Sequence, residues 1–163
     1  MADDASALAQ MSDSGPLGLT RGEQVLLAGL RLWAGLRLSG EAPQASVRQL
    51  MAEQVSDRAG AIFVAMMESL ERQTRRPVEI RCGPCAGYAQ DEQRLIVACG
   101  VSRVDMATAR ALLTPLVMQP EPVAIFARAL NMVLSHEGLD MPARLLDAPF
   151  PPGPGGGPSV TLH

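Results

Sequence analysis

The chain has 163 residues, of which 47% are hydrophobic and 3% aromatic, and its net charge is −3. A chain of this length is one domain with a sizeable core, and a core poor in rings but rich in Leu, Ala and Met favours packed helices over sheet. The mild acidity excludes a protein that coats nucleic acid or an anionic membrane by bulk electrostatics.

The N-terminal stretch MADDASALAQ is acidic where a secretory signal is basic, and no apolar signal region follows it. The longest clean apolar run covers residues 61–67, far below the ~20 residues that span a bilayer. We therefore expect a cytoplasmic protein without a membrane partner. Three cysteines, an odd number, argue against a structural disulfide framework there. Every basic residue is arginine, which we attribute to a GC-rich bacterial coding sequence.

Composition divides the chain into three parts. Residues 1–18 are polar and without periodicity, which predicts a disordered segment, and residues 149–163 are a Pro/Gly-rich stretch that we expect to be a flexible tail. Residues 19–148 form the single helical domain. Within it, Thr20 and Glu23 have the spacing of a capping box, which predicts a helix that begins at Arg21.

Apolar spacing predicts the remaining elements in chain order. The first helix is apolar around more than half of its circumference, so we expect it to be central. The others are helices over residues 47–55, 62–70, 91–100, 103–117 and 120–137, and one short extended segment over 77–82 that has no evident partner strand. The predicted fold is therefore all-α, a compact bundle of five to six helices with disordered ends.

The sequence CGPC at residues 82–85 has the spacing of half a zinc site. Cys99 supplies a third ligand, and His136 is the only histidine inside the expected folded region, so these four residues are the predicted zinc ligands. Each of the last two also has a structural interpretation. Cys99 lies at an apolar helical position, and His136 lies near a helix C-terminus, where its charge suits the dipole. Thiols without metal remain an open alternative.

Residues 78–85 also resemble the strand and active-site motif of the thioredoxin family. In that family the reactive cysteine lies at a helix N-terminus after a core strand, where its thiolate is stabilised. The resemblance implies a thiol–disulfide redox protein that uses Cys82 and Cys85. It is confined to these residues, and Arg81 stands where the family has tryptophan.

The stretch EQRLIVACGVSRVDMATARALL resembles the bacterial helix-turn-helix pattern, with Gly100 at the turn. The resemblance implies a DNA-binding regulator that uses residues 92–112, with bases read by Ser102, Arg103 and Thr108. Ile96 stands at a position that is usually small, and Asp105 is acidic where phosphates approach. A basic cluster compensates for the acidic net charge; it consists of Arg72, Arg75, Arg76 and Arg81.

Enzyme signatures are missing from the sequence. It contains no GxSxG and no glycine-rich phosphate loop. The neighbouring carboxylates Asp91 and Glu92 are expected to be solvated charges at the start of a helix. We therefore predict a non-enzymatic protein-interaction or adaptor domain, whose partner is another protein or a second copy. The apolar first helix and the Met66–Met67 pair of the third helix are the candidates for its surface, although a methionine pair with this spacing is more often part of the core.

Overall fold

The computed structural model describes residues 18–144 and 159–162. Within these ranges the fold is all-α with a minor two-stranded sheet, which confirms the predicted class. Its elements are α2 (Arg21–Leu38), α3 (Gln44–Gln54), α4 (Asp57–Arg72), β1 (Val78–Arg81), α5 (Gln90–Val101), α6 (Met106–Leu113), α7 (Pro120–His136) and β2 (Ser159–Leu162). The predicted disordered segment, residues 1–18, lies outside the described ranges except for its last residue.

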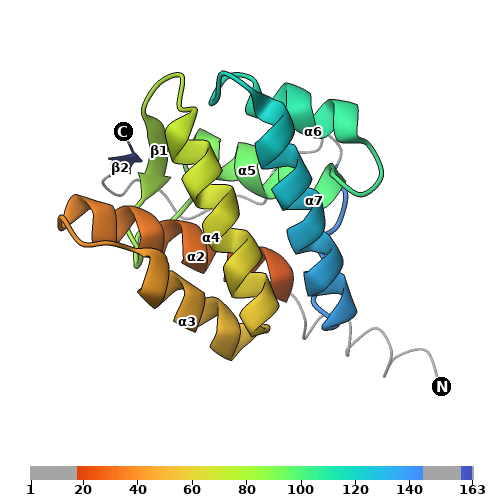
Figure 1. The fold of residues 1–163 in the computed structure, drawn as a ribbon, viewed down its shortest axis with the longest axis horizontal. Helices are drawn as coiled ribbons and strands as arrows, with labels where there is room; N and C mark the ends of the chain where they lie inside the picture. The colour runs from red at the N-terminus through yellow and green to blue at the C-terminus, as the bar shows by residue number, and fades with distance from the viewer. Residues whose placement is uncertain (1–17, 145–158, 163) are drawn as a thin grey trace.

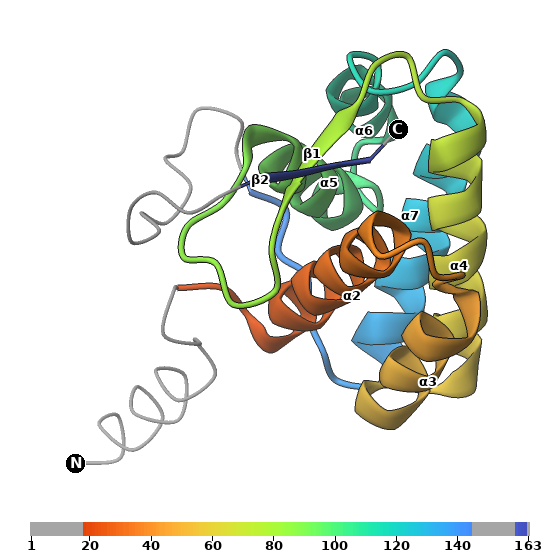
Figure 2. The same ribbon diagram turned by 90° about the vertical axis from the view of Figure 1, so that its left-hand side faces the viewer.

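The helices form two layers. Figure 1 shows α4 between α3 and α7, and these three helices pack as one layer. In Figure 2 the second layer, made of α2, α5 and the two strands, lies beside the first. Helix α6 packs against both α5 and α7 and so joins the layers. No helix in the described ranges combines the length and apolar character that crossing a bilayer requires.

Helix α2 begins at Arg21, as the capping residues predict. The Thr20 hydroxyl accepts a hydrogen bond from the Glu23 backbone N–H at 3.3 Å. The Glu23 carboxylate accepts two hydrogen bonds from the Arg144 guanidinium, at 3.0 and 2.9 Å, so this helix start is also tied to the end of the helical domain. The central position of α2 is confirmed, because Leu26 and Trp33 on its apolar face are fully buried.

The methionines of α4 belong to the core. Met66 and Met67 are 1% and 0% exposed and pack with Phe63 in the main hydrophobic cluster. The expectation that this pair forms a partner-binding surface is therefore wrong. Helix α4 starts at a true cap, since the Ser56 hydroxyl accepts a hydrogen bond from the Ala59 N–H at 3.2 Å.

The extended segment has a partner strand after all. β1 pairs antiparallel with β2, in the register Val78 with Leu162 and Arg81 with Ser159. Both Val78 and Leu162 are buried, so a short alternating segment at the chain end completes the core under β1. The prediction of a flexible tail over 149–163 is thus corrected for residues 159–162, and its other residues lie outside the described ranges.

Helix α6 is shorter than the predicted helix over 103–117. It starts at Met106 because Asp105 caps it: the carboxylate accepts hydrogen bonds from the Thr108 N–H at 3.0 Å and from the Thr108 hydroxyl at 2.6 Å. Helix α7 runs as predicted, with proline in its first turn and Gly138 at a φ of +77° after its end.

Candidate functional site

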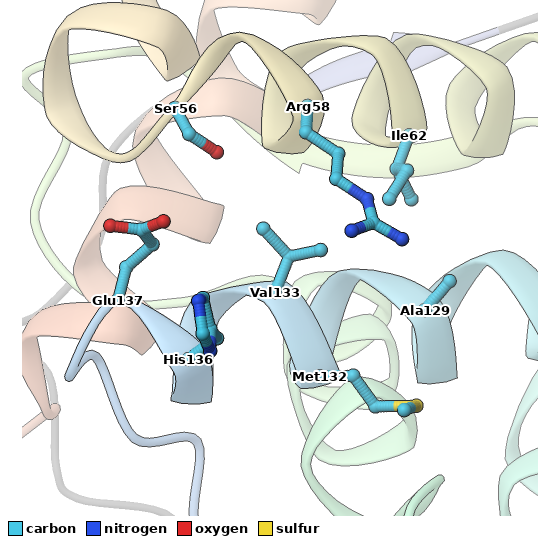
Figure 3. A pocket seen from close by; sticks show the side chains of 8 residues that line it. All are labelled: Ser56, Arg58, Ile62, Ala129, Met132, Val133, His136 and Glu137. Carbon is cyan, nitrogen blue, oxygen red and sulfur yellow. The ribbon is translucent and has the colours of Figure 1, made fainter.

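The four predicted zinc ligands lie in three parts of the structure. Cys82 and Cys85 are joined to each other by a disulfide. Cys99 is buried in the core on α5, and His136 lines a surface pocket at the end of α7 (Figure 3). Among the described residues, no group of three or more His, Cys, Asp or Glu side chains is placed to hold a metal ion. The structure therefore does not bring these four residues together.

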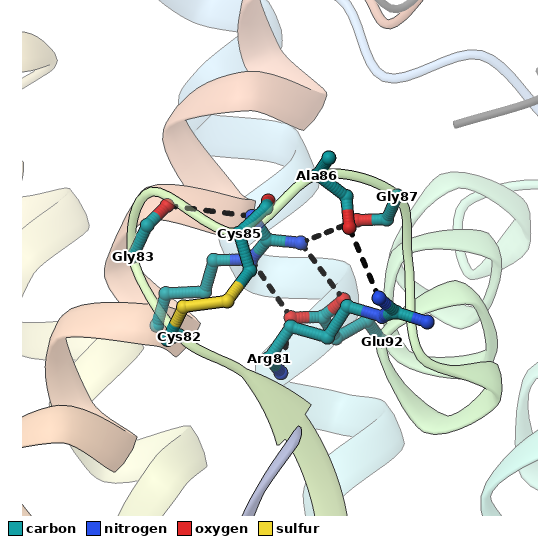
Figure 4. Close-up of a disulfide and its surroundings, with 8 residues drawn as sticks. Arg81, Cys82, Gly83, Cys85, Ala86, Gly87 and Glu92 are labelled. Atoms are coloured by element: carbon teal, nitrogen blue, oxygen red, sulfur yellow. Dashed lines mark hydrogen bonds and ion pairs between the residues drawn. A yellow bond between two sulfur atoms is a disulfide. The ribbon is translucent and has the colours of Figure 1, made fainter. Parts of the chain in front are cut away.

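The CGPC sequence forms a tight turn between β1 and α5 (Figure 4). The Cys85 N–H donates to the Cys82 carbonyl at 3.1 Å, and the disulfide closes the same four residues. The two central residues, Gly83 and Pro84, are exposed, and both cysteines are partly buried. The turn thus presents its tip to solvent and its sulfur atoms near the surface.

A buried arginine from α2 supports this turn. Arg31 is only 7% exposed. Its guanidinium donates to three backbone carbonyls of the turn and the segment after it: Gly83 at 3.4 Å, Cys85 at 2.7 Å and Gly87 at 2.7 Å. A planar guanidinium has five N–H donors in a fixed geometry, so one side chain can hold several carbonyls in place.

Glu92 on α5 neutralises that arginine. Its carboxylate is fully buried and accepts from Arg31 at 2.9 and 3.1 Å. It also accepts from the backbone N–H groups of Arg81 at 3.0 Å and Ala89 at 2.9 Å. One ion pair between α2 and α5 therefore fixes both ends of the segment that carries the CGPC turn, which we call the Arg31–Glu92 anchor.

The neighbouring carboxylate of Asp91 performs a similar task at the start of β1. It accepts two hydrogen bonds from Arg76, both at 2.7 Å, and one from the Glu79 N–H at 2.8 Å. Burial alone would raise the pKa of the Asp91 carboxyl, but these hydrogen bonds outweigh it and hold the pKa below its usual range. The expectation that Asp91 and Glu92 are solvated charges is wrong, since they are 2% and 0% exposed.

Two adjoining pockets lie along α2 beside the CGPC turn, and Ala28 lines both of them. The first has a volume of about 420 Å³, and besides Ala28 its lining residues are Arg31, Leu32, Gly35, Leu36, Ser39, Glu41 and Gly83. The other, of about 250 Å³, continues to Arg21, Gln24, Leu50 and Gln54. A Cβ atom added at Gly35 would meet no other atom within 4 Å, so the pocket is open at this residue. We call these two pockets the α2 groove.

The sulfur chemistry differs from what the thioredoxin resemblance implies. α5 begins at Gln90, five residues after Cys85, so the turn does not lie at a helix N-terminus. The remaining thiol, Cys99, is buried, and burial raises its pKa to about 12. Because thiolates are the reactive form, Cys99 is inert at neutral pH.

The residues proposed to read DNA are placed differently from one another. Ser102 is fully buried, and its hydroxyl donates to the Cys99 carbonyl at 2.7 Å. Thr108 is engaged in the cap of α6, and Arg103 is exposed. The basic cluster is also reduced, because the carboxylate of Asp91 neutralises Arg76.

Sequence reasoning missed Arg31 and Glu92, the residues that organise the turn. One signal was available: Arg31 is a single charge within the apolar run LLAGLRLWAGL of α2. A charged residue in such a run is either exposed to solvent or buried beside a partner of opposite charge. The sequence does not identify that partner.

Comparison with known proteins adds no relative: no protein-family model, curated protein or solved structure matches the chain.

Proposed function

We propose that the protein is a non-enzymatic interaction domain that binds a helical segment of a partner protein in the α2 groove. The observation that carries this proposal is the α2 groove itself, two adjoining and mainly apolar pockets along the exposed side of α2. An amphipathic helix that lays its apolar face into such a groove is a common mode of peptide recognition.

The shape and lining of the groove suit a helix. Ala28 and Gly35 are small, which lets another backbone approach closely, while Leu32 and Leu36 offer apolar contact. α2 has 18 residues, so at 1.5 Å per residue this helix is roughly 27 Å long, the length of about five turns of a partner helix.

Polar groups at both ends give the partner a direction. Arg21 and Gln54 are hydrogen-bonded to each other at 3.1 Å at one end, and Glu41 and Ser39 lie at the other, beside the CGPC turn. A cation at one end and a carboxylate at the other favour a partner with the opposite arrangement of charges.

Groove variants test the proposal. Gly35→Leu should block the floor while raising helix propensity, so folding should be kept and partner binding reduced at least tenfold. Ala28→Arg should have the same effect on binding, and Ala61→Arg, at an exposed position of α4, is the matched control. Partners are captured on the purified protein, quantified by mass spectrometry and cross-linked to locate their contact.

The result that would overturn the proposal is equal capture by the groove and control variants, or cross-links that avoid α2. Self-association through the same groove is measured by light scattering on the purified protein. A dimer that Gly35→Leu dissociates would identify the partner as a second copy.

A second candidate function is thiol–disulfide exchange, favoured by the bonded Cys82–Cys85 pair at the edge of the groove. A partner dithiol would transfer two electrons and two protons to this disulfide, leaving the CGPC pair as two thiols and the partner as a disulfide. The test is a titration of the pair against glutathione. A disulfide that a physiological glutathione ratio never reduces would exclude the exchange.

Zinc binding and DNA binding have less support from the geometry. Zinc binding would require the Cys82–Cys85 disulfide to be reduced. It would also require other ligands, because Cys99 and His136 lie apart from the turn. Elemental analysis of the reduced protein tests it. DNA reading by residues 92–112 rests on Arg103, so Arg103→Ala and a salt titration on genomic fragments test it.

A further inference from the structure

A second hollow lies between α4 and α7, and it has no lining residue in common with the α2 groove. The pocket has a volume of about 520 Å³, within the range of sites that hold small molecules. Its wall is apolar and comes from both helices (Figure 3): Ile62 on α4, with Ala129, Met132 and Val133 on α7. Met132 is 54% exposed, so this apolar surface opens to solvent.

Polar side chains are distributed unevenly around that wall. Figure 3 shows the Arg58 guanidinium reaching between the two helices near Ile62 and Val133, while Glu137 lies at the other side of Val133, near Ser56. His136 lies in the same hollow. Positive charge therefore lies against the apolar wall, and the carboxylate lies at the opposite end.

Arg58 has donors to offer. Arg58 is one of several arginines of the described residues whose guanidinium lies within ion-pair distance of no carboxylate. The Ser56 hydroxyl, by contrast, is already used in the cap of α4. A guanidinium beside an apolar wall suits a carboxylate attached to an apolar body, because the fork binds both carboxylate oxygens.

We propose that this pocket binds a small amphiphilic carboxylate, with its carboxylate on Arg58 and its apolar body against Ile62, Met132 and Val133. Glu137 disfavours the reversed orientation, since it would face the ligand's negative charge. The site is independent of the α2 groove, and neither proposal depends on the other.

Binding is tested with octanoate as the probe, followed by ¹H–¹⁵N NMR on the full chain. Octanoate should shift the amide signals of Ile62, Val133 and His136 in a saturable way, and octanamide, which has the same apolar body and no charge, should bind at least tenfold more weakly. Arg58→Gln should weaken octanoate about tenfold or more, the loss expected for a charge-assisted hydrogen bond. Arg72→Gln, an exposed arginine at the other end of α4, is the matched control.

A second variant removes the space without touching the charge. Ala129→Trp should fill the pocket and abolish octanoate binding, and the dispersion of the NMR spectrum reports whether the fold is kept. Three results would overturn the proposal: equal affinity for octanoate and octanamide, equal loss in the Arg58 and Arg72 variants, or shifts that centre on α2 instead of on α4 and α7.

Discussion

At the scale of single residues, the Arg31–Glu92 anchor changes how the CGPC sequence is interpreted. Within the turn, the carbonyls of Gly83 and Cys85 accept hydrogen bonds from the buried Arg31 guanidinium, which is paired with the buried Glu92 carboxylate. The disulfide therefore closes a turn whose position another interaction already determines. The contribution of the disulfide to stability can therefore be measured separately from that of the Arg31–Glu92 anchor.

Breaking the anchor should cost more stability than breaking the disulfide. Glu92→Gln leaves the buried Arg31 uncompensated, and losing one partner of a buried pair costs about 3–5 kcal/mol. The double variant Cys82→Ser with Cys85→Ser opens a loop of only four residues. The chain-entropy estimate for closing such a loop is about 2 kcal/mol of stability. Urea denaturation measures both variants.

Glu121→Gln is the control, because its ion pair with Arg110 is exposed and should contribute under about 1 kcal/mol. A disulfide variant less stable than Glu92→Gln would show that the turn, and not the anchor, holds this region together.

Asp91 gives the second prediction, which concerns pH. Its pKa is lowered in the folded protein, so its contribution is complete above the unfolded carboxyl pKa of about 3.9 and disappears as the pH falls through the folded pKa. Asp91→Asn should therefore lower the free energy of unfolding by about 1–3 kcal/mol at pH 7, with the difference shrinking below about pH 4. Chemical denaturation between pH 2 and pH 7 measures it, and a difference that does not change with pH would contradict the assignment.

At the scale of elements, the sequence predicted the helices because their signals are local. Thr20, Glu23 and the apolar spacing of α4 act within a few residues of one another, so position and type follow from the sequence alone. α6 was predicted too long because Asp105 was interpreted as a charge within the helix, whereas it is the cap. Strand β2 was missed because its partner β1 lies some eighty residues earlier, and pairing at that distance has no periodic signal.

The β1–β2 pair gives the third prediction. Leu162→Ala should lower the free energy of unfolding by about 1.5–3 kcal/mol, because Leu162 is 3% exposed and lies opposite buried Val78. Leu38→Ala is the control, since Leu38 is 71% exposed and its loss should cost under about 0.5 kcal/mol. Thermal unfolding compares the two, and equal effects would mean that the strand pair contributes nothing to stability.

At the scale of the whole molecule, the candidate site was only partly predictable. The CGPC turn was recognised from its spacing, yet what positions it comes from Arg31, far away in sequence, and from Glu92, which the sequence presents as an ordinary helix-start carboxylate. Periodicity reports which face of one helix is apolar; it does not report which two helices meet, so a buried charge cannot be matched with its partner from one sequence. The α2 groove was missed for the same reason, as it exists only once α3 and the turn flank α2.

The ties that hold α2 have a consequence for synthesis on the ribosome. α2 is the first described helix to emerge, but Glu92 follows Arg31 by 61 residues, and Arg144 follows Glu23 by 121. The helix pairs α3–α4 and α5–α6 need only neighbouring sequence and can form as they appear, and α2 can pack against α3 early, but its polar ties are completed only after Glu92 and Arg144 have been made. Of the described helices, the one that is made first therefore gains its polar ties to α5 and to Arg144 only late in synthesis.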